Sequence, residues 1–173
     1  MKRQGQIWIE TVIYTLIIIV IIGILLSILT PALNQRKDQA VIEQSMNMLN
    51  ELNGAIEDAR FYGAGNSIPV EMQLKKGELL IDGEQDYILF SITSNYLYSE
   101  ANQSFMRGKI NITSVKQTNG YEIYLKMDYK GIINLTWDNR DVKKIIQPAS
   151  NPYELSVSNL GRVNELININ LNS

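Results

Sequence analysis

The hydrophobic residues of this chain change their spacing near residue 31. Over 6–30 they follow one another almost without interruption, and no charged residue lies between Thr11 and Gln35. A helix of about 25 residues is long enough to cross a hydrocarbon core of about 30 Å. The pattern therefore predicts an apolar helix over 6–30 that can span a membrane.

Residues 31–63 continue with a helical pattern of a different kind, in which apolar residues recur every three to four positions between charged ones. The apolar members are Val41, Ile42, Met48, Leu49, Leu52, Ala55, Ile56 and Ala59. This spacing predicts an amphipathic helix with one buried face; a membrane anchor followed by a separate surface helix is the alternative. We expect Pro31 to bend the helix or interrupt its hydrogen bonds, and Gly54 to cost it about 1 kcal/mol. Gly63 and Gly65 are expected to end it.

After residue 65 apolar and polar residues alternate, which is the period of a half-buried β-strand. Two hairpins are expected, one around residues 83–86 and one at the Asn119-Gly120 turn. The predicted strands cover 78–82, 87–92, 109–116, 121–129, 132–137, 142–146, 153–157 and 162–171. We therefore expect an α+β fold. A long N-terminal helix, apolar in its first half and amphipathic in its second, would pack on an antiparallel β-meander that forms a head domain at 66–173.

Composition removes most kinds of catalytic chemistry. The 173 residues include no Cys and no His, which excludes disulfides, thiol catalysis, and the commonest general base and metal ligand. The net charge of -2 comes without a basic stripe, so nucleic-acid binding is not expected. The chain is therefore expected to be neither an enzyme nor a cofactor-binding protein.

The residues before the apolar stretch carry the most specific signal in the chain. Lys2 and Arg3 form a short basic leader, Gly5 follows it, and Glu10 is a lone acidic residue at the start of the apolar run. An unpaired carboxylate at the mouth of a membrane helix is costly, so we expect it to have a use. An ordinary secretory signal is cleaved after its apolar stretch, whereas here the small residue precedes it. The basic leader predicts a cytoplasmic N-terminus, with the bulk of the chain outside the cell.

This arrangement resembles the class III signal peptide of archaeal type IV prepilins, whose pattern is Gln-x-Ser-x-Glu-x-x-x-Leu. Gln6 and Glu10 match the pattern, whereas Trp8 and Tyr14 replace its Ser and Leu. The match is carried by residues 2–30, and the layout of the remaining chain, a helix followed by strands, is also similar to that of pilins.

The resemblance implies a structural subunit of an archaeal type IV pilus-like surface filament. A prepilin peptidase would cleave after Gly5 and remove residues 1–5 as a leader. Residues 6–30 would be the membrane helix of the precursor and then part of the filament core. Identical subunits would polymerise through this helix, with Glu10 of one paired with the new α-amine of Gln6 on its neighbour. Membrane lipid, a membrane assembly platform and its ATPase are the other implied partners.

Two other functions fit the same residues. One is a membrane-tethered extracellular binding protein, held by an uncleaved signal anchor. The other is a minor pseudopilin, serving secretion or DNA uptake without forming the main filament. Glu10 discriminates between polymer and tether, because a monomeric anchor has no need of a carboxylate there.

The head also contains possible modification sites. Three N-x-S/T sequons, which are acceptors for N-glycosylation in surface proteins, begin at Asn102, Asn111 and Asn134. All three lie in the part of the chain that is expected outside the cell. All three are therefore candidate N-glycosylation sites.

Two further groups of polar and aromatic residues are open to more than one interpretation. Asp82, Glu84 and Asp86 offer oxygen ligands for Ca²⁺, but such a group is more often a solvated hairpin turn, and no metal site is predicted. Three aromatic residues in a less regular stretch either face a partner or pack within the head. They are Tyr96, Tyr98 and Phe105.

Overall fold

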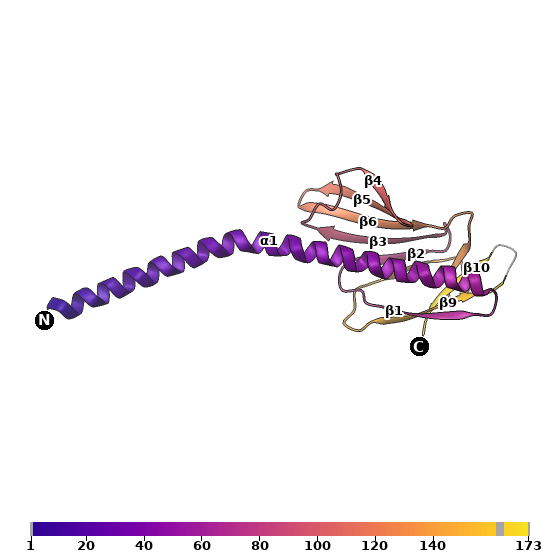
Figure 1. The fold of residues 1–173 in the computed structure, drawn as a ribbon, viewed down its shortest axis with the longest axis horizontal. Coiled ribbons are helices and arrows are strands. Elements are labelled where there is room, and N and C mark those ends of the chain that lie inside the picture. Colours follow the sequence, from indigo (N-terminus) through magenta and orange to yellow (C-terminus); the bar gives the residue numbers. More distant parts are fainter. Residues whose placement is uncertain (1, 162–164, 173) are drawn as a thin grey trace. The chain divides into compact units, whose positions relative to one another are not determined.

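The computed structural model describes the backbone of residues 2–161 and 165–172, and side chains within these ranges from Trp8 onward. The chain forms two compact units, Met1–Lys37 and Asp38–Ser173. The described residues of the first are all helical, and the second contains the rest of the same helix together with the strands. The predicted α+β fold, with one long N-terminal helix packed against sheets that are mostly antiparallel, is confirmed (Figure 1).

A single helix, α1 (Lys2–Tyr62), forms the N-terminal part of the described chain. The helix continues through Pro31, so proline does not end it there. Pro31 has no N–H with which to bond the preceding turn. Just before it, the hydroxyls of Ser27 and Thr30 each donate, at 2.7 Å, to a backbone carbonyl oxygen of their own helix. Such bonds give those oxygens a further donor and are compatible with a continuous helix.

The end of α1 lies where the glycines predict it. Gly63 and Gly65 have φ angles of +80° and +87°, which L-residues other than glycine adopt at a cost. The N–H of Gly63 donates to the carbonyl oxygen of Arg60 at 3.2 Å, and the N–H of Gly65 donates to that of Asn159 at 2.9 Å. The turn therefore closes the helix and connects it to a distant part of the head.

From Asp38 onward one face of α1 is buried, which confirms the predicted amphipathic pattern. Seven of the eight apolar residues predicted for this face are buried in the hydrophobic core, and Val41 packs against it. The opposite face is exposed and mostly polar. Its residues include Gln44, Asn47, Glu51, Gly54 and Asp58.

Six strands form one antiparallel sheet. They are β2 (Glu78–Asp82), β3 (Tyr87–Ser94), β4 (Ser104–Arg107), β5 (Ile110–Gln117), β6 (Gly120–Asp128) and β8 (Lys143–Ile146). Their order is β4-β5-β6-β3-β2-β8, and both predicted hairpins, β2–β3 and β5–β6, are present (Figure 1). Strand β4 was not predicted, because all four of its side chains are exposed and no apolar alternation marks it.

The other four strands form a second, mixed sheet. They are β1 (Ser67–Met72), β7 (Asn134–Trp137), β9 (Tyr153–Asn159) and β10 (Leu166–Leu171). Their order is β1-β9-β10-β7, in which only β7 and β10 run parallel. The head therefore differs from the expected single meander. A parallel pair needs a long crossover connection, and here the chain between β7 and β10 supplies it by way of β8 and β9.

One hydrophobic core joins both sheets to α1 within the second unit. Leu49 of α1, Phe90 of β3, Leu125 of β6 and Leu155 of β9 are all fully buried members of it. No residue before Asp38 belongs to this core among the described side chains. The head is thus stabilised without help from the apolar part of the helix.

Candidate assembly helix and head surfaces

The apolar part of α1 has no covering within the described chain. Every described side chain from Trp8 to Lys37 is exposed, and large apolar residues continue from Trp8 to Leu33. By length and composition α1 can cross a membrane, and none of its most apolar window is buried. Soluble monomers rarely expose contiguous apolar patches larger than a few hundred Å². This segment is therefore suited to a membrane or to a bundle of apolar helices.

Glu10 stands at the start of this apolar surface. Its side chain is exposed and forms no ion pair with any described residue. The predicted cleavage site between Gly5 and Gln6 also lies within α1, but the side chains there are outside the described residues. Glu10 is four residues, about one helical turn, beyond Gln6.

Where α1 enters the head, a buried carboxylate connects three segments. Asp38 Oδ1 accepts a hydrogen bond from Lys76 Nζ at 2.7 Å, and Oδ2 accepts one from the backbone N–H of Asn95 at 2.7 Å. Burial by itself raises the pKa of Asp38, but the bonds from Lys76 and Asn95 outweigh it, so the pKa lies below its usual value of 3.8. Sequence reasoning missed this site, because its partners are distant in the chain and no local pattern marks them.

The aromatic residues near β4 pack on one another and on α1. Tyr98 and Phe105 are stacked, with ring centroids 6.3 Å apart. The Tyr98 hydroxyl donates to Glu43 Oε1 at 2.8 Å and accepts from Arg107 Nη1 at 2.7 Å. Burial, together with the bond to Glu43, raises the pKa of Tyr98. Tyr96 and Tyr98 pack against the core, whereas Phe105 stays 41% exposed. The structure therefore supports packing within the head as the main role of Tyr96 and Tyr98.

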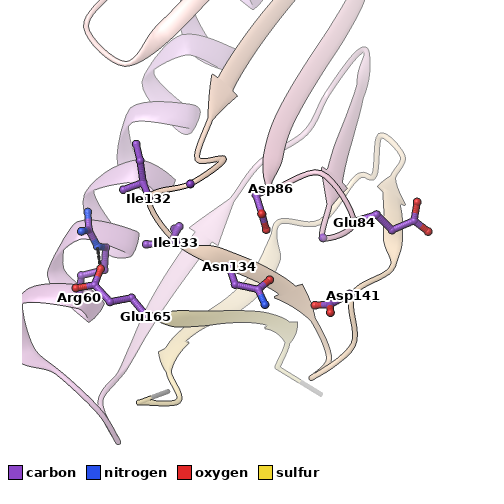
Figure 2. A pocket seen from close by; sticks show the side chains of 10 residues that line it. Arg60, Glu84, Asp86, Ile132, Ile133, Asn134, Asp141 and Glu165 are labelled. Carbon is purple, nitrogen blue, oxygen red and sulfur yellow. Dashed lines mark hydrogen bonds and ion pairs between the residues drawn. The ribbon is translucent and has the colours of Figure 1, made fainter. Parts of the chain in front are cut away.

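A cavity of about 720 Å³ opens in the head beside the last turn of α1. It is lined by Arg60, Gly83, Glu84, Asp86, Gly131, Ile132, Ile133, Asn134, Asp141 and Glu165. Figure 2 shows Arg60 and Glu165 on one side of the cavity and Glu84 and Asp141 on the other. Arg60 donates to Glu165 at 2.6 Å and to Glu57 at 2.9 Å. The bond to Glu165 is the largest cause of the raised pKa of the guanidinium, and the charges of both carboxylates add to it. The lining combines charged side chains with one amide and two isoleucines.

The three acidic residues of the β2–β3 turn do not converge on one point. Asp82 is fully buried, and its Oδ1 accepts hydrogen bonds from the backbone N–H groups of Glu84 and Gln85 at 3.0 and 3.1 Å. Its Oδ2 lies 3.4 Å from Lys143 Nζ. Asp86 Oδ1 instead accepts the backbone N–H of a β7 residue at 2.9 Å. No group of three potential ligands capable of holding a metal occurs among the described residues, so the arrangement is that of a hydrogen-bonded turn.

The three sequons differ in accessibility. Asn102 is exposed in the β3–β4 loop, where its φ is +62° and its backbone N–H donates to the carbonyl oxygen of Ser114 at 2.7 Å. Asn111 lies within β5, and its Oδ1 is buried without a hydrogen-bond partner among the described residues. Asn134 is partly buried at the start of β7, and the hydroxyl of its sequon residue Thr136 is buried. The folded head therefore presents Asn102 most openly.

Comparison with known proteins leaves the function to be argued from the chain itself. No protein-family model matches it, no curated protein is significantly similar to it, and no solved structure is significantly similar to its fold. The features that any functional argument must use are therefore the uncovered apolar helix, the unpaired Glu10 and the surfaces of the head.

Proposed function

We propose that the chain is a structural subunit of an archaeal type IV pilus-like surface filament. The observation that carries the proposal is the fully exposed apolar stretch of α1, attached to a head whose core does not use it. Such a stretch needs apolar surroundings, which lipid supplies to a precursor and neighbouring helices supply to a polymer. The prepilin-like residues Gly5, Gln6 and Glu10 support the second stage, in which subunits polymerise.

The proposed sequence of events uses each N-terminal feature. The precursor inserts into the membrane with its basic leader inside the cell and its head outside. A prepilin peptidase then removes residues 1–5. An assembly platform with its ATPase moves the mature subunit into the filament. Cleavage creates a positively charged α-amine on Gln6. Glu10 of a neighbouring subunit, which has no ion-pair partner among the described residues, then pairs with it.

A second candidate is a membrane-tethered extracellular binding protein, or a minor pseudopilin outside the main filament. The cavity of about 720 Å³ in the head favours binding, because pockets of this size hold small ligands. Glu10 argues for the polymer, since a tether gains nothing from a carboxylate at the edge of the membrane. The two candidates differ in whether residues 1–5 are removed and whether copies associate.

The deciding experiment is the mass of the mature chain, measured on protein released from the surface of cells that make it. We expect loss of residues 1–5 and an N-terminus at Gln6, with the released material visible as filaments by electron microscopy. Surface-exposed chains that keep Lys2 and Arg3 overturn the proposal and favour the tethered protein. Gly5→Leu, which puts a bulky side chain at the cleaved bond, is the matched control and should retain the leader.

A further inference from the structure

The exposed face of α1 in the head has a feature that the single chain does not explain. Gly54 lies inside the helix, about two turns before its end at Tyr62, and glycine at an interior helix position costs about 1 kcal/mol relative to alanine. A Cβ atom at this position would meet no atom within 4 Å, so packing within the chain does not require a glycine. Gly54 therefore leaves an open place on the exposed face that a second molecule can approach closely.

Gly54 lies between two acidic side chains on the same face. Glu51 and Asp58, three residues before it and four after it, are neighbours of Gly54 on the helix surface. Both are exposed, and neither forms an ion pair with any described residue. We call the surface made by Asn47, Glu51, Gly54 and Asp58 the acidic helix face.

The complementary charges lie further back on the same helix. Arg36 and Lys37 are exposed and likewise form no ion pair with any described residue. Along a helix they precede Gly54 by about 26 Å, at 1.5 Å per residue. The two groups therefore cannot pair within one chain, but two copies displaced along the helix axis by that distance bring them level.

We propose that the acidic helix face of one copy binds the Arg36–Lys37 segment of a second copy, with Gly54 as the point of closest approach. This inference rests on the proposed function, because it specifies where the polymerised helices meet outside the membrane segment. The missing side chain at Gly54 lets the second helix come close. Glu51 and Asp58 then flank its basic pair, and other displacements leave these charges unpaired. The displacement of about 26 Å is larger than the single helical turn that separates Glu10 from Gln6, so this contact joins a subunit to a different neighbour from the one that pairs with Glu10.

The absence of cysteine from the chain makes this contact directly testable. The full-length variant Lys37→Cys with Gly54→Cys is produced in cells that carry the peptidase and assembly machinery. Within one chain these positions are about 26 Å apart along the helix, whereas a disulfide needs Cα atoms within about 7 Å. Mild oxidation should therefore give a ladder of covalent multimers on a non-reducing gel. The control Lys37→Cys with Glu71→Cys, whose second site is exposed on β1, should stay mostly monomeric.

Charge reversal provides an independent measurement. Arg36→Glu with Lys37→Glu should lower filament number by about tenfold or more, because like charges then face each other. Adding Glu51→Lys and Asp58→Lys to the same chain should restore filaments. No change in filament number on reversal, at equal protein level in the membrane, would contradict the proposed contact.

The outcomes separate this inference from the proposed function. If the surface protein lacks residues 1–5 and forms filaments, but the Lys37–Gly54 cysteine pair cross-links no better than its control, the inference is wrong and the proposed function stands. If the surface protein retains its leader and forms no filaments, both are wrong. A ladder specific to the Lys37–Gly54 pair supports both.

Discussion

The hydroxyl of Tyr129 donates a hydrogen bond to Oδ1 of Asn53 across 2.8 Å, and so joins the residue that follows β6 to the C-terminal part of α1. The tyrosine is 1% exposed and its ring lies under Lys109 Nζ at 5.1 Å. Burial, with a smaller effect from the charge of Glu57, raises the pKa of Tyr129, so the phenol stays protonated and remains a donor. One polar bond thus fixes the helix against the six-stranded sheet at the centre of the head.

Tyr129→Phe should lower the free energy of unfolding of the head by about 1 kcal/mol. The ring remains to fill the core, but Asn53 loses a donor and must rely on water at its partly exposed site. Chemical denaturation followed by circular dichroism measures the change. Tyr121→Phe, at a partly buried tyrosine for which no side-chain hydrogen bond is described, is the matched control and should change stability less. Equal effects of the two substitutions would show that the bond to Asn53 contributes little.

The ion pair between Asp38 and Lys76 makes part of the stability dependent on pH. Because the pKa of Asp38 in the folded head lies below its usual 3.8, ionisation of Asp38 stabilises the fold above that value. This contribution is lost as the pH falls through the lower, folded-state pKa. Asp38→Asn should therefore cost about 1–3 kcal/mol at pH 7, and the difference from the unsubstituted protein should shrink below about pH 4.

Denaturation curves at pH 7 and pH 3 measure this effect. Asp141→Asn, at an exposed carboxylate with no ion pair among the described residues, controls for the loss of a negative charge. A gap between Asp38→Asn and the unsubstituted protein that stays constant from pH 7 to pH 3 would show that ionisation of Asp38 is not its source.

Local patterns predicted those parts of the fold that depend on neighbouring residues. The spacing of Ile42, Leu49 and Leu52 identified the buried helix face, and the Asn119-Gly120 turn identified the β5–β6 hairpin. The parallel pairing of β7 with β10 depends on a crossover that no local pattern records. The same applies to side-chain contacts such as Asp38 with Lys76, which are 38 residues apart. The sequence therefore predicted where the helix and strands occur better than it predicted which strands pair and which distant side chains meet.

The candidate functional residues divide in the same way, into those that a local sequence pattern marks and those that it does not. Glu10 and the apolar run were evident because a charge beside uncharged residues is a local signal, and the structure leaves that carboxylate unpaired among the described residues. The acidic helix face was not predicted as a surface. In the sequence Glu51 and Asp58 have the spacing of ordinary solvated charges, and the structure adds that both are exposed and form no ion pair with any described residue. Cleavage at Gly5 stays a prediction.

A chain that begins at residue 31 should fold as a soluble head. The buried core contains no described residue before Asp38, so removal of the apolar stretch takes nothing from it. Circular dichroism should show mixed helix and strand with a cooperative melt, whereas the full chain should need detergent. An insoluble product, or a melt without cooperativity, would show that the apolar stretch contributes to folding of the head.

Glycan, where the producing cell attaches it to the folded chain, should be found mainly on Asn102. This side chain is exposed in a loop, whereas Asn111 has a buried carbonyl oxygen and Asn134 depends on the buried hydroxyl of Thr136. Mass spectrometry of glycopeptides measures the occupancy of each sequon. Asn102→Gln should remove most of the glycan mass, and the control Asn134→Gln should change it little. Dominant occupancy at Asn111 or Asn134 would contradict this prediction.

The last prediction concerns Glu10 and the amine that cleavage creates on Gln6. An α-amine has a pKa near 8 and is positively charged at neutral pH. At a separation of about 4 Å and an effective dielectric constant of about 20, its attraction to a carboxylate is on the order of 4 kcal/mol. Desolvation of both groups offsets much of this gain. The pair therefore contributes more to the choice of register than to total affinity, because other displacements leave two unpaired charges among apolar helices.

Glu10→Gln should therefore leave membrane insertion and cleavage after Gly5 intact while it impairs assembly. The substitution preserves the size of the side chain and removes only its charge, and no bond within the described head depends on Glu10. Filament number and length by electron microscopy, with the mass of the membrane-bound chain measured in parallel, test both halves of the prediction. Glu71→Gln, an exposed carboxylate on β1, is the control that should assemble normally. Filaments of normal number and length from Glu10→Gln cells would show that the subunits find their register without this charge pair.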